Sequence, residues 1–264
     1  MLVATYNINN INRRFDALRT WLCIRKPDVV CLQELKCRND DFPTTELQDL
    51  GYNAVWQGER SWNGVAILSR VGTPVVTCRE LPGDALDRQA RYIEAAVRGI
   101  IVASIYAPNG NPQPGPKFDY KLAWLDRLRR RATRLRRSGA PVILAGDFNV
   151  APTHVDIYDE RSWREDALIQ PQSRAAFNKL VGRSWTDAVR HLHPERRIYT
   201  FWSYFRNRWP RDAGLRLDHL LLSQDLVPRL EEAGVDRDVR GLPDASDHAP
   251  AWIRLDTPPR LKSI

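Results

Sequence analysis

The feature that most constrains the fold is a set of apolar, strand-like runs that each carry a short polar motif at one end. Val29 to Leu32 and Val142 to Ala145 are apolar throughout, which predicts strands buried on both faces. Polar residues at the ends of several strands tend to converge on one cleft. The four motifs are Asn7-Ile8-Asn9, Leu32-Gln33-Glu34, Gly146-Asp147-Phe148-Asn149 and Ser246-Asp247-His248.

The residue types in these motifs suit a hard metal cation. Glu34, Asp147 and Asp247 supply carboxylates, and the asparagines supply carboxamide oxygens. Oxygen ligands without a cysteine cluster indicate Mg²⁺, with Mn²⁺ as a substitute. Glu34 taken alone has an equally good alternative, because a carboxylate at the end of a buried strand can pair with Lys36 or cap a helix.

The motif around Asp147 suits phosphoryl chemistry. Gly146 permits a hard turn and lets a phosphate approach the backbone, and Asp147 and Asn149, two residues apart, then point the same way. A carboxylate can accept a proton from water, and a carboxamide can donate a hydrogen bond to a phosphoryl oxygen. The alternative is an Asx-type turn in which both side chains bond only the local backbone.

His248 follows Asp247 and has a second candidate partner in Asp218. A buried aspartate bonded to one ring nitrogen fixes the tautomer and raises the pKa of the histidine, so the other nitrogen can present a proton to phosphate. A structural or exposed histidine is the alternative. No serine lies in a nucleophile-elbow context, which argues against a covalent serine mechanism.

The charge balance points to a polyanionic partner. Forty Lys and Arg residues against 32 Asp and Glu residues give a net charge of +8. A basic protein with acidic residues at its strand ends is typical of an enzyme that attracts a phosphate backbone and binds metal at its centre. The alternative is that the charge serves only solubility, since an excess of basic residues does not by itself establish nucleic-acid binding.

Composition narrows the class further. A hydrophobic content of 43% is enough for a substantial core, and no apolar run approaches the roughly 20 residues of a membrane span. Residues 1–6 lack a basic or long apolar signal region and are predicted to form the first strand. Cys23, Cys31, Cys37 and Cys78 show no zinc-like spacing, so we expect reduced thiols in a cytoplasmic protein.

The order of predicted elements indicates one domain, residues 1–257, followed by a short C-terminal tail, residues 258–264. We expect an α/β (α+β) fold, a four-layer α/β-β/α sandwich of two packed mixed sheets with outer helices. No linker rich in Gly, Ser or Pro divides the chain. The expected helices are 13–25 and 117–137, and the expected strands are 2–6, 28–32, 64–68, 92–97, 100–105, 142–145, 215–222 and 249–255.

The predicted helix at 117–137 has an apolar stripe and an arginine-rich face. The stripe consists of Phe118, Leu122, Leu125, Leu128, Ala132 and Leu135. The other face carries Arg127, Arg130, Arg131, Arg134 and Arg137. This face could touch DNA, but we favour a solvated face whose last-turn cations interact well with the helix dipole.

Several segments, in order along nearly the whole chain, carry a family resemblance. They are Tyr6 to Asn9, Lys26 to Glu34, Asn63 to Leu68, Tyr106 to Gly110, Gly146 to Asn149, Tyr199 to Trp202, Gly214 to Asp218 and Ser246 to Pro250. In these segments the chain resembles exonuclease III and the related apurinic/apyrimidinic endonucleases of the endonuclease/exonuclease/phosphatase superfamily.

The resemblance implies a role for each polar residue of the motifs. Glu34 would be the main Mg²⁺ ligand, and Asp147 would activate or orient the attacking water. The residues that line the metal side would be Asn7, Asn9 and Asp247.

It also implies how the phosphate is held. Asn149 and Tyr106 would hold the phosphate, with Asn109 beside them as a substrate contact. His248, oriented by Asp218, would stabilise the pentavalent transition state.

The segment around Phe201 would recognise the lesion. In similar enzymes, residues that match Phe201, Leu215 and Leu217 receive the flipped, base-free sugar, because a small apolar pocket accepts it and excludes a nucleotide by size. Ordinary core packing is the alternative. Further substrate contacts would come from Trp202 and from the duplex-probing loop at 205–209, through Arg206, Asn207 and Trp209.

The implied protein is an Mg²⁺-dependent hydrolase of DNA base excision repair, of the AP endonuclease and exodeoxyribonuclease III type. It would cut double-stranded DNA 5′ to abasic sites and act on blocked 3′ ends as a 3′–5′ exonuclease and as a 3′-phosphatase or 3′-phosphodiesterase. We expect a monomer without a membrane partner. The alternatives are a non-specific or RNA nuclease, another phosphatase of the superfamily, and a non-enzymatic DNA-binding protein, against which the intact polar set argues.

Overall fold

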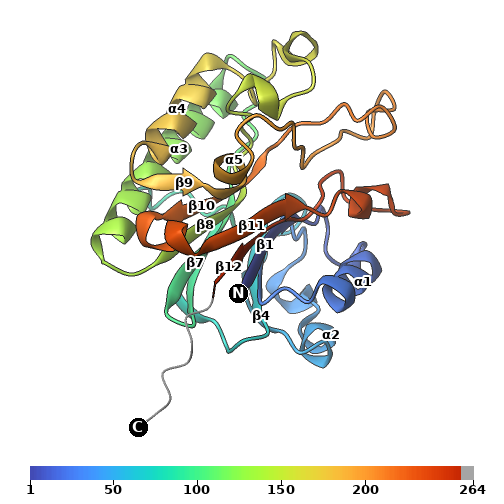
Figure 1. Cartoon of the computed structure of the whole chain (residues 1–264), viewed down its shortest axis with the longest axis vertical. Helices are drawn as coiled ribbons and strands as arrows, with labels where there is room; N and C mark the ends of the chain where they lie inside the picture. The colour runs from blue at the N-terminus through green and yellow to red at the C-terminus, as the bar shows by residue number, and fades with distance from the viewer. Residues whose placement is uncertain (257–264) are drawn as a thin grey trace.

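Two six-stranded sheets pack against each other, and helices cover their outer faces (Figure 1). The computed structural model describes residues 1–256. The first sheet has the order β11-β12-β1-β2-β4-β3 and the second the order β5-β6-β7-β8-β10-β9. Each sheet contains one parallel pair, β1 with β2 and β7 with β8, among antiparallel neighbours. The predicted four-layer sandwich of mixed sheets is therefore confirmed.

The elements have the following bounds. The first sheet contains β1 (Leu2–Asn7), β2 (Val29–Gln33), β3 (Asn53–Gln57), β4 (Val65–Ser69), β11 (Leu230–Val235) and β12 (Ala251–Leu255). The second contains β5 (Val75–Cys78), β6 (Tyr92–Val97), β7 (Ile100–Tyr106), β8 (Val142–Asp147), β9 (Trp185–Asp187) and β10 (Asp218–Ser223). The α-helices are α1 (Phe15–Arg25), α2 (Thr44–Asp49), α3 (Pro116–Arg137), α4 (Pro171–Val181) and α5 (Ala188–Leu192). Short 3₁₀ helices are η1 (Asn39–Asp41), η2 (His154–Asp156), η3 (Glu160–Trp163), η4 (Gln224–Arg229) and η5 (Arg237–Gly241).

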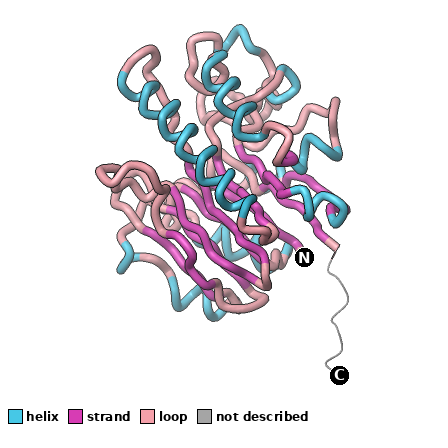
Figure 2. Tube along the Cα trace, turned by 90° about the vertical axis from the view of Figure 1, so that its left-hand side faces the viewer, coloured by secondary structure: helices cyan, strands magenta, loops and turns pink. Residues whose placement is uncertain are grey.

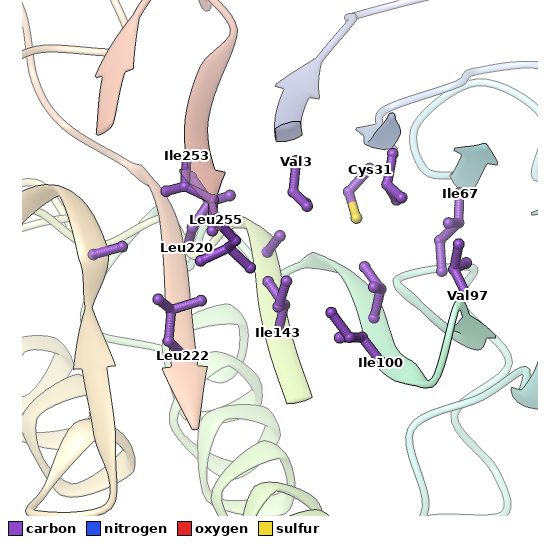
Figure 3. Close-up of a cluster of buried hydrophobic side chains, with 14 of the residues drawn as sticks. Val3, Cys31, Ile67, Val97, Ile100, Ile143, Leu220, Leu222, Ile253 and Leu255 are labelled. Carbon is purple, nitrogen blue, oxygen red and sulfur yellow. The ribbon is translucent and has the colours of Figure 1, made fainter. Parts of the chain in front are cut away.

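The central strands are buried on both faces, as their continuous apolar runs predict. In β2, Val29 and Cys31 join the core between the sheets, whereas Val30 and Leu32 join a second core under α1. Successive strand residues point to opposite faces, so a strand between two apolar layers needs apolar residues at every position. The inter-sheet core is drawn in Figure 3, where side chains from both sheets face one another.

The long helix α3 covers the outer face of the second sheet (Figure 2). It begins at Pro116, whose fixed φ suits the first helical position. Its buried residues include Phe118, Leu125 and Leu128, as predicted, but Lys121 is buried where the predicted stripe has Leu122.

The arginine-rich face of α3 was expected to be solvated or to touch DNA. Neither expectation holds for Arg127 and Arg131. Arg127 is buried and pairs with Asp87 at 2.8 Å, and Arg131 pairs with the buried Glu94 at 2.8 Å. These partners come from distant segments, so the helix sequence alone could not indicate them. Two of the five arginines therefore anchor the helix to its neighbours.

The main difference from the expected element boundaries lies in the segment before β10, where single β-bridges are present instead of a continuous strand. The strand at 92–97 is confirmed, but the strand expected at 215–222 begins only at Asp218. Leu215 instead forms isolated bridges to Ile157 and Phe201. Strands β3, β5, β9 and β11 and helices α2, α4 and α5 were not expected, because edge strands and short helices carry weak patterns.

The predicted tail, residues 258–264, lies outside the described residues, as does residue 257. Within residues 1–256, the helices are all too short or too polar to cross a bilayer.

Gly146 lies inside β8, opposite Ile105 of β7 and His219 of β10, and the hard turn expected there is wrong. A Cβ atom at this position would lie 1.9 Å from the Ile105 carbonyl oxygen. The neighbouring backbone therefore requires a residue without a side chain.

We predict that Gly146→Ala destabilises the protein by about 1–3 kcal/mol or more, since the new methyl group overpacks a site bounded by backbone. The matched control is Gly139→Ala, where φ is also positive at +74° but a Cβ would meet nothing within 4 Å. Chemical denaturation of both variants measures the difference. Equal losses of stability would mean that the close approach to Ile105 does not matter.

Candidate active site

The polar ends of strands from both sheets meet at one edge of the sandwich. In the first sheet, Asn7 at the end of β1 lies opposite Gln33 of the parallel strand β2. In the second sheet, Tyr106 of β7 and Asp218 of β10 both lie opposite Asp147 of β8. Strands of different sheets thereby deliver their terminal side chains to a shared site.

Direct hydrogen bonds join the two sheets at this edge. The amide nitrogen of Asn7 donates to Glu34 Oε1 at 2.8 Å and to Asp147 Oδ2 at 3.0 Å. The hydroxyl of Ser246 donates to the Asn7 carbonyl oxygen at 2.7 Å. The buried Asn7, which belongs to one of the four sequence motifs, thus contacts a residue of each of the other three.

Glu34, Asn9 and Asp247 form the acidic side of the site. Asn9 Nδ2 donates to Asp247 Oδ1 at 3.0 Å. Lys36 Nζ lies 2.7 Å from Glu34 Oε2 and 2.7 Å from Asn9 Oδ1. Burial alone would raise the pKa of Glu34, but Lys36 and the hydrogen bond from Asn7 hold it below its usual value. The pairing of Glu34 with Lys36, which the sequence left open, is present.

These residues fit a hard divalent cation. Glu34 and Asn9 already direct oxygens at one cation, the Lys36 ammonium, so the electrostatic environment favours positive charge there. Within residues 1–256, no group of three His, Cys, Asp or Glu side chains is arranged to hold a metal. Mg²⁺ commonly takes one or two protein carboxylates and completes its shell with water and phosphate.

Asp147 lies at the centre of the site and is almost fully buried. Its Oδ1 accepts from the backbone N–H of Asn149 at 2.8 Å, and its Oδ2 lies 3.8 Å from His248 Nε2. Burial raises the pKa of Asp147 to about 7; repulsion from Asp218 and Glu34 adds to this, whereas His248 opposes it. The carboxyl is therefore suited to accept a proton.

His248 and Asp218 form a buried pair. Asp218 Oδ2 lies 2.7 Å from His248 Nδ1, and the Asp218 backbone N–H donates to the Thr200 hydroxyl at 3.1 Å. Burial would lower the pKa of His248, but Asp218 more than offsets it and the pKa rises to about 10. The predicted partnership places a charged imidazolium with Nε2 directed toward Asp147.

Asn149 and Tyr106 complete the phosphate side. Asn149 has a positive φ of 52°, which a short polar side chain tolerates, and its Nδ2 donates to the Ala107 carbonyl at 2.9 Å. Asn109 Nδ2 lies 3.4 Å from Asn149 Oδ1. Burial and the nearby Glu34 raise the pKa of Tyr106 well above its usual value, so its hydroxyl stays protonated.

The apolar residues predicted for lesion recognition lie beside the catalytic residues. Phe201, Leu215 and Leu217 belong to one cluster, and the Phe201 ring lies 5.0 Å from the His248 ring. Trp163 of η3 packs edge-on against Phe201 at 6.2 Å. Trp163 was missed in the sequence, because its segment resembles no motif.

Trp202 and Trp209 do not join this cluster. Trp202 is 1% exposed and packs with Tyr199 and Ala249, and Trp209 packs edge-on against it at 5.0 Å. Successive residues of an extended segment point to opposite sides, so Phe201 and Trp202 cannot both face the site. Trp202 therefore packs in the core instead of the apolar cluster, whereas Trp209 is half-buried, and the substrate contacts expected of both stay predictions.

The predicted duplex-probing loop is only partly exposed. Arg206 and Asn207 are exposed and have positive φ values of 60° and 48°. The next residue, Arg208, is buried, and its guanidinium lies 4.6 Å from the Trp163 ring centre. Phe205, at 77% exposure, is the apolar side chain that the loop presents to solvent.

Comparisons with known proteins show the family to which the chain belongs. Residues 4–248 match the Endonuclease/Exonuclease/phosphatase family. The chain is 30% identical to exodeoxyribonuclease III of Haemophilus influenzae, over 97% of this chain and 100% of that protein. An AP endonuclease from Archaeoglobus fulgidus is similar in structure, with a TM-score of 0.91 and 32% identity over 97% of this chain and 100% of that one.

The 3′-5′ exonuclease NExo from Neisseria meningitidis is also similar, with a TM-score of 0.93 and 37% identity over 97% of this chain and 100% of that one. A second NExo structure, described as a 3′ phosphatase bound to a product DNA hairpin, gives a TM-score of 0.92 and 36% identity over the same shares. Because the family model matches residues 4–248 and the similar proteins cover nearly the whole chain, this chain belongs to the endonuclease/exonuclease/phosphatase family.

Proposed function

We propose that this protein is a DNA-repair phosphodiesterase that cuts the backbone of duplex DNA 5′ to abasic sites and also processes 3′ ends. The observation that carries the proposal is the convergence of Asp147, Asn149 and the Asp218–His248 pair on one buried edge. Together they provide a proton acceptor, a carboxamide and an imidazolium around a space suited to a phosphate. The names of the similar proteins support DNA as the substrate.

The chain's own residues account for the main steps of an in-line attack on phosphorus. Asp147 orients a water molecule and accepts its proton. Asn149 and the protonated Nε2 of His248 donate hydrogen bonds to phosphoryl oxygens as negative charge grows on them. Asp218 holds the imidazolium in place. The products are a 3′ hydroxyl on one side and a 5′ phosphate on the abasic sugar on the other.

A divalent metal fits the acidic side, and we propose Mg²⁺, with Mn²⁺ as a substitute. Glu34 would be its main ligand, with Asn7, Asn9 and Asp247 lining the site. When bound, the ion supplies positive charge that offsets charge developing on the phosphate. The Lys36 ammonium, which contacts Glu34 and Asn9, would have to give up part of this contact.

The cluster of Phe201, Leu215 and Leu217 supports recognition of a base-free sugar. It is apolar and adjoins His248, so a sugar without a base could lie against it while its 5′ phosphate reaches the catalytic groups. We propose that the protein acts as a monomer, with its net charge of +8 attracting the DNA backbone.

Processing of 3′ ends is a second activity of the same site. It is supported by the similarity to NExo, whose structures are described as those of a 3′-5′ exonuclease and a 3′ phosphatase. All these reactions use the same attack of water on phosphorus, and they differ in the groups that are bonded to the phosphate.

The function is tested with purified protein on duplexes that carry an abasic analogue, a nick, a 3′ phosphate or no lesion, with and without Mg²⁺. We expect Mg²⁺-dependent incision 5′ to the abasic analogue and removal of the 3′ phosphate. No incision of the abasic duplex, with activity only at 3′ ends, would contradict the abasic-site proposal.

Asp147→Asn should lower turnover by at least about 10²–10⁴-fold, the range typical of lost general-base catalysis, while DNA affinity stays nearly unchanged. The substitution removes the proton acceptor but keeps its size. Single-turnover kinetics and a gel shift measure the two effects, with Asp119→Asn on the exposed face of α3 as the control. Collapsed DNA binding would assign Asp147 a structural role.

Glu34→Gln should raise the Mg²⁺ concentration needed for half-maximal rate by at least about tenfold, since even outer partners of metal ligands contribute about 10–100-fold to affinity. A metal titration of the cleavage rate measures this shift. Glu231→Gln on the exposed side of β11 is the control. If Glu34→Gln reached its half-maximal rate at the same Mg²⁺ concentration as the wild-type protein, Glu34 would not be a metal ligand.

His248→Ala and Asp218→Ala should each lower turnover by about 10²–10³-fold, as does loss of one donor to a developing oxyanion. The double variant should lose a similar amount, because residues that act as a unit are not additive. Turnover of all three is compared with that of His191→Ala, a substitution at an exposed histidine. Multiplicative losses would show that the pair does not act together.

A further inference from the structure

Lys121 is a fully buried cation in the first half of α3. Its ammonium Nζ lies 2.9 Å from the carbonyl oxygen of Asn109, 2.6 Å from that of Asn149 and 3.4 Å from that of Ala167. Within the described residues, no carboxylate forms an ion pair with it. A protonated lysine has three N–H donors and no acceptor, which matches three carbonyls.

The three carbonyls belong to three separate loops of the proposed active site. Asn109 follows β7, Asn149 follows β8, and Ala167 precedes α4. The Ala167 carbonyl also accepts from the Ser173 hydroxyl at 2.7 Å, so Lys121 matters most to the carbonyls of Asn109 and Asn149. Leaving a buried carbonyl without a donor is costly. One side chain therefore ties together loops that are far apart in the sequence.

These loops carry the groups that would hold the substrate. The carboxamides of Asn109 and Asn149 lie 3.4 Å apart. Leu168 and Ile169, directly after Ala167, pack in the same cluster as Leu215 and Leu217. The ammonium thus lies beneath both the phosphate side and the wall of the apolar cluster.

The helix offers no structural reason for a lysine here. Lys121 lies three residues after Phe118 and four before Leu125, so it interrupts the buried apolar stripe of α3. Burial lowers its pKa to about 7, although Asp147 and Asp166 oppose the shift. Well-packed apolar residues often stabilise a core more than buried charges do. The lysine is therefore explained by the loop carbonyls that it contacts, and not by the apolar packing of the helix.

The fit around the side chain is close. A Cβ atom on Gly110 would lie 2.6 Å from Lys121 Cδ, so the glycine leaves room for the lysine stem. The stem thereby reaches the three carbonyls through a path that a larger neighbour would close.

We infer that Lys121 is a positioning residue, whose ammonium holds the loops of Asn109, Asn149 and Ala167 in the arrangement that catalysis needs. This inference rests on the proposed function, because it assigns Lys121 to the same phosphate site. Lys121 does not touch the substrate; it acts through the Asn149 carboxamide.

The test uses Lys121→Met, which keeps the length and apolar stem but removes the charge and all three donors. On the abasic duplex, kcat should fall by about ten- to a hundredfold, since displacement of a catalytic group by about 1 Å can cost about 10²-fold. KM should change by less than about threefold, because the DNA-binding surface is untouched. The matched control is Lys117→Met, one turn away on the exposed face of α3, which should keep wild-type kinetics.

A double-mutant cycle with Asn149→Ala separates positioning from general loss of structure. If Lys121 acts through Asn149, adding Lys121→Met to Asn149→Ala should lower kcat by less than about threefold further. A full additional loss would overturn the inference, as would wild-type kcat in Lys121→Met. Thermal melting is run beside the kinetics. If Lys121→Met does not fold, Lys121→Gln, which keeps two N–H donors, takes its place in the same cycle.

Failure of the proposed function gives a different result. A wild-type protein that cleaves none of the duplexes would overturn the function and, with it, the inference. An active wild type with an unaffected Lys121 variant would overturn the inference alone.

Discussion

The packing of the two sheets against each other decides the position of every polar strand end in this protein. Val3, Ile67, Ile143 and Ile253 contribute to a core that strands of both sheets share. This core fixes β1 and β8 relative to each other, so Asn7 can donate to Asp147 across the interface at 3.0 Å. A site made of strand ends from two sheets is only as well arranged as the apolar layer beneath it.

The second constraint is charge. Glu34, Asp147, Asp218 and Asp247 bring four carboxyl groups to one largely buried edge, where mutual repulsion is strong. The structure balances them with cations that each contact a different part of the site. Lys36 contacts Glu34, and His248 contacts Asp218 and faces Asp147. Lys121 adds a third cation, which contacts backbone carbonyls instead of carboxylates. This distribution leaves Asp147 free of a tight ionic partner, as a proton acceptor requires.

Much of the site could be predicted because its chemistry depends on residue types in short motifs. The residues that lie together, as their motifs implied, are at or near the ends of regular strands: Asn7, Glu34, Asp147, Asn149 and His248. Lys121 lies three residues after Phe118 and four before Leu125, a spacing that places it on the apolar side of α3. This spacing alone does not identify a buried lysine, because a lysine can also lie where the apolar side meets the solvated side. Trp163 carried no usable signal, because it lies on a short 3₁₀ helix in a segment of irregular pattern.

The sequence by itself determined which strands are buried and which polar residues end them, because apolar runs and strand periodicity are local properties. Only the tertiary structure decided which of those residues meet. It placed Gly146 against the Ile105 carbonyl instead of in a turn, and it turned Trp202 into the core while Phe201 faces His248. It also gave Arg127 and Arg131 buried partners in Asp87 and Glu94. Each of these outcomes depends on residues distant along the chain, and such contacts exist only once the two sheets have packed and brought those residues within reach.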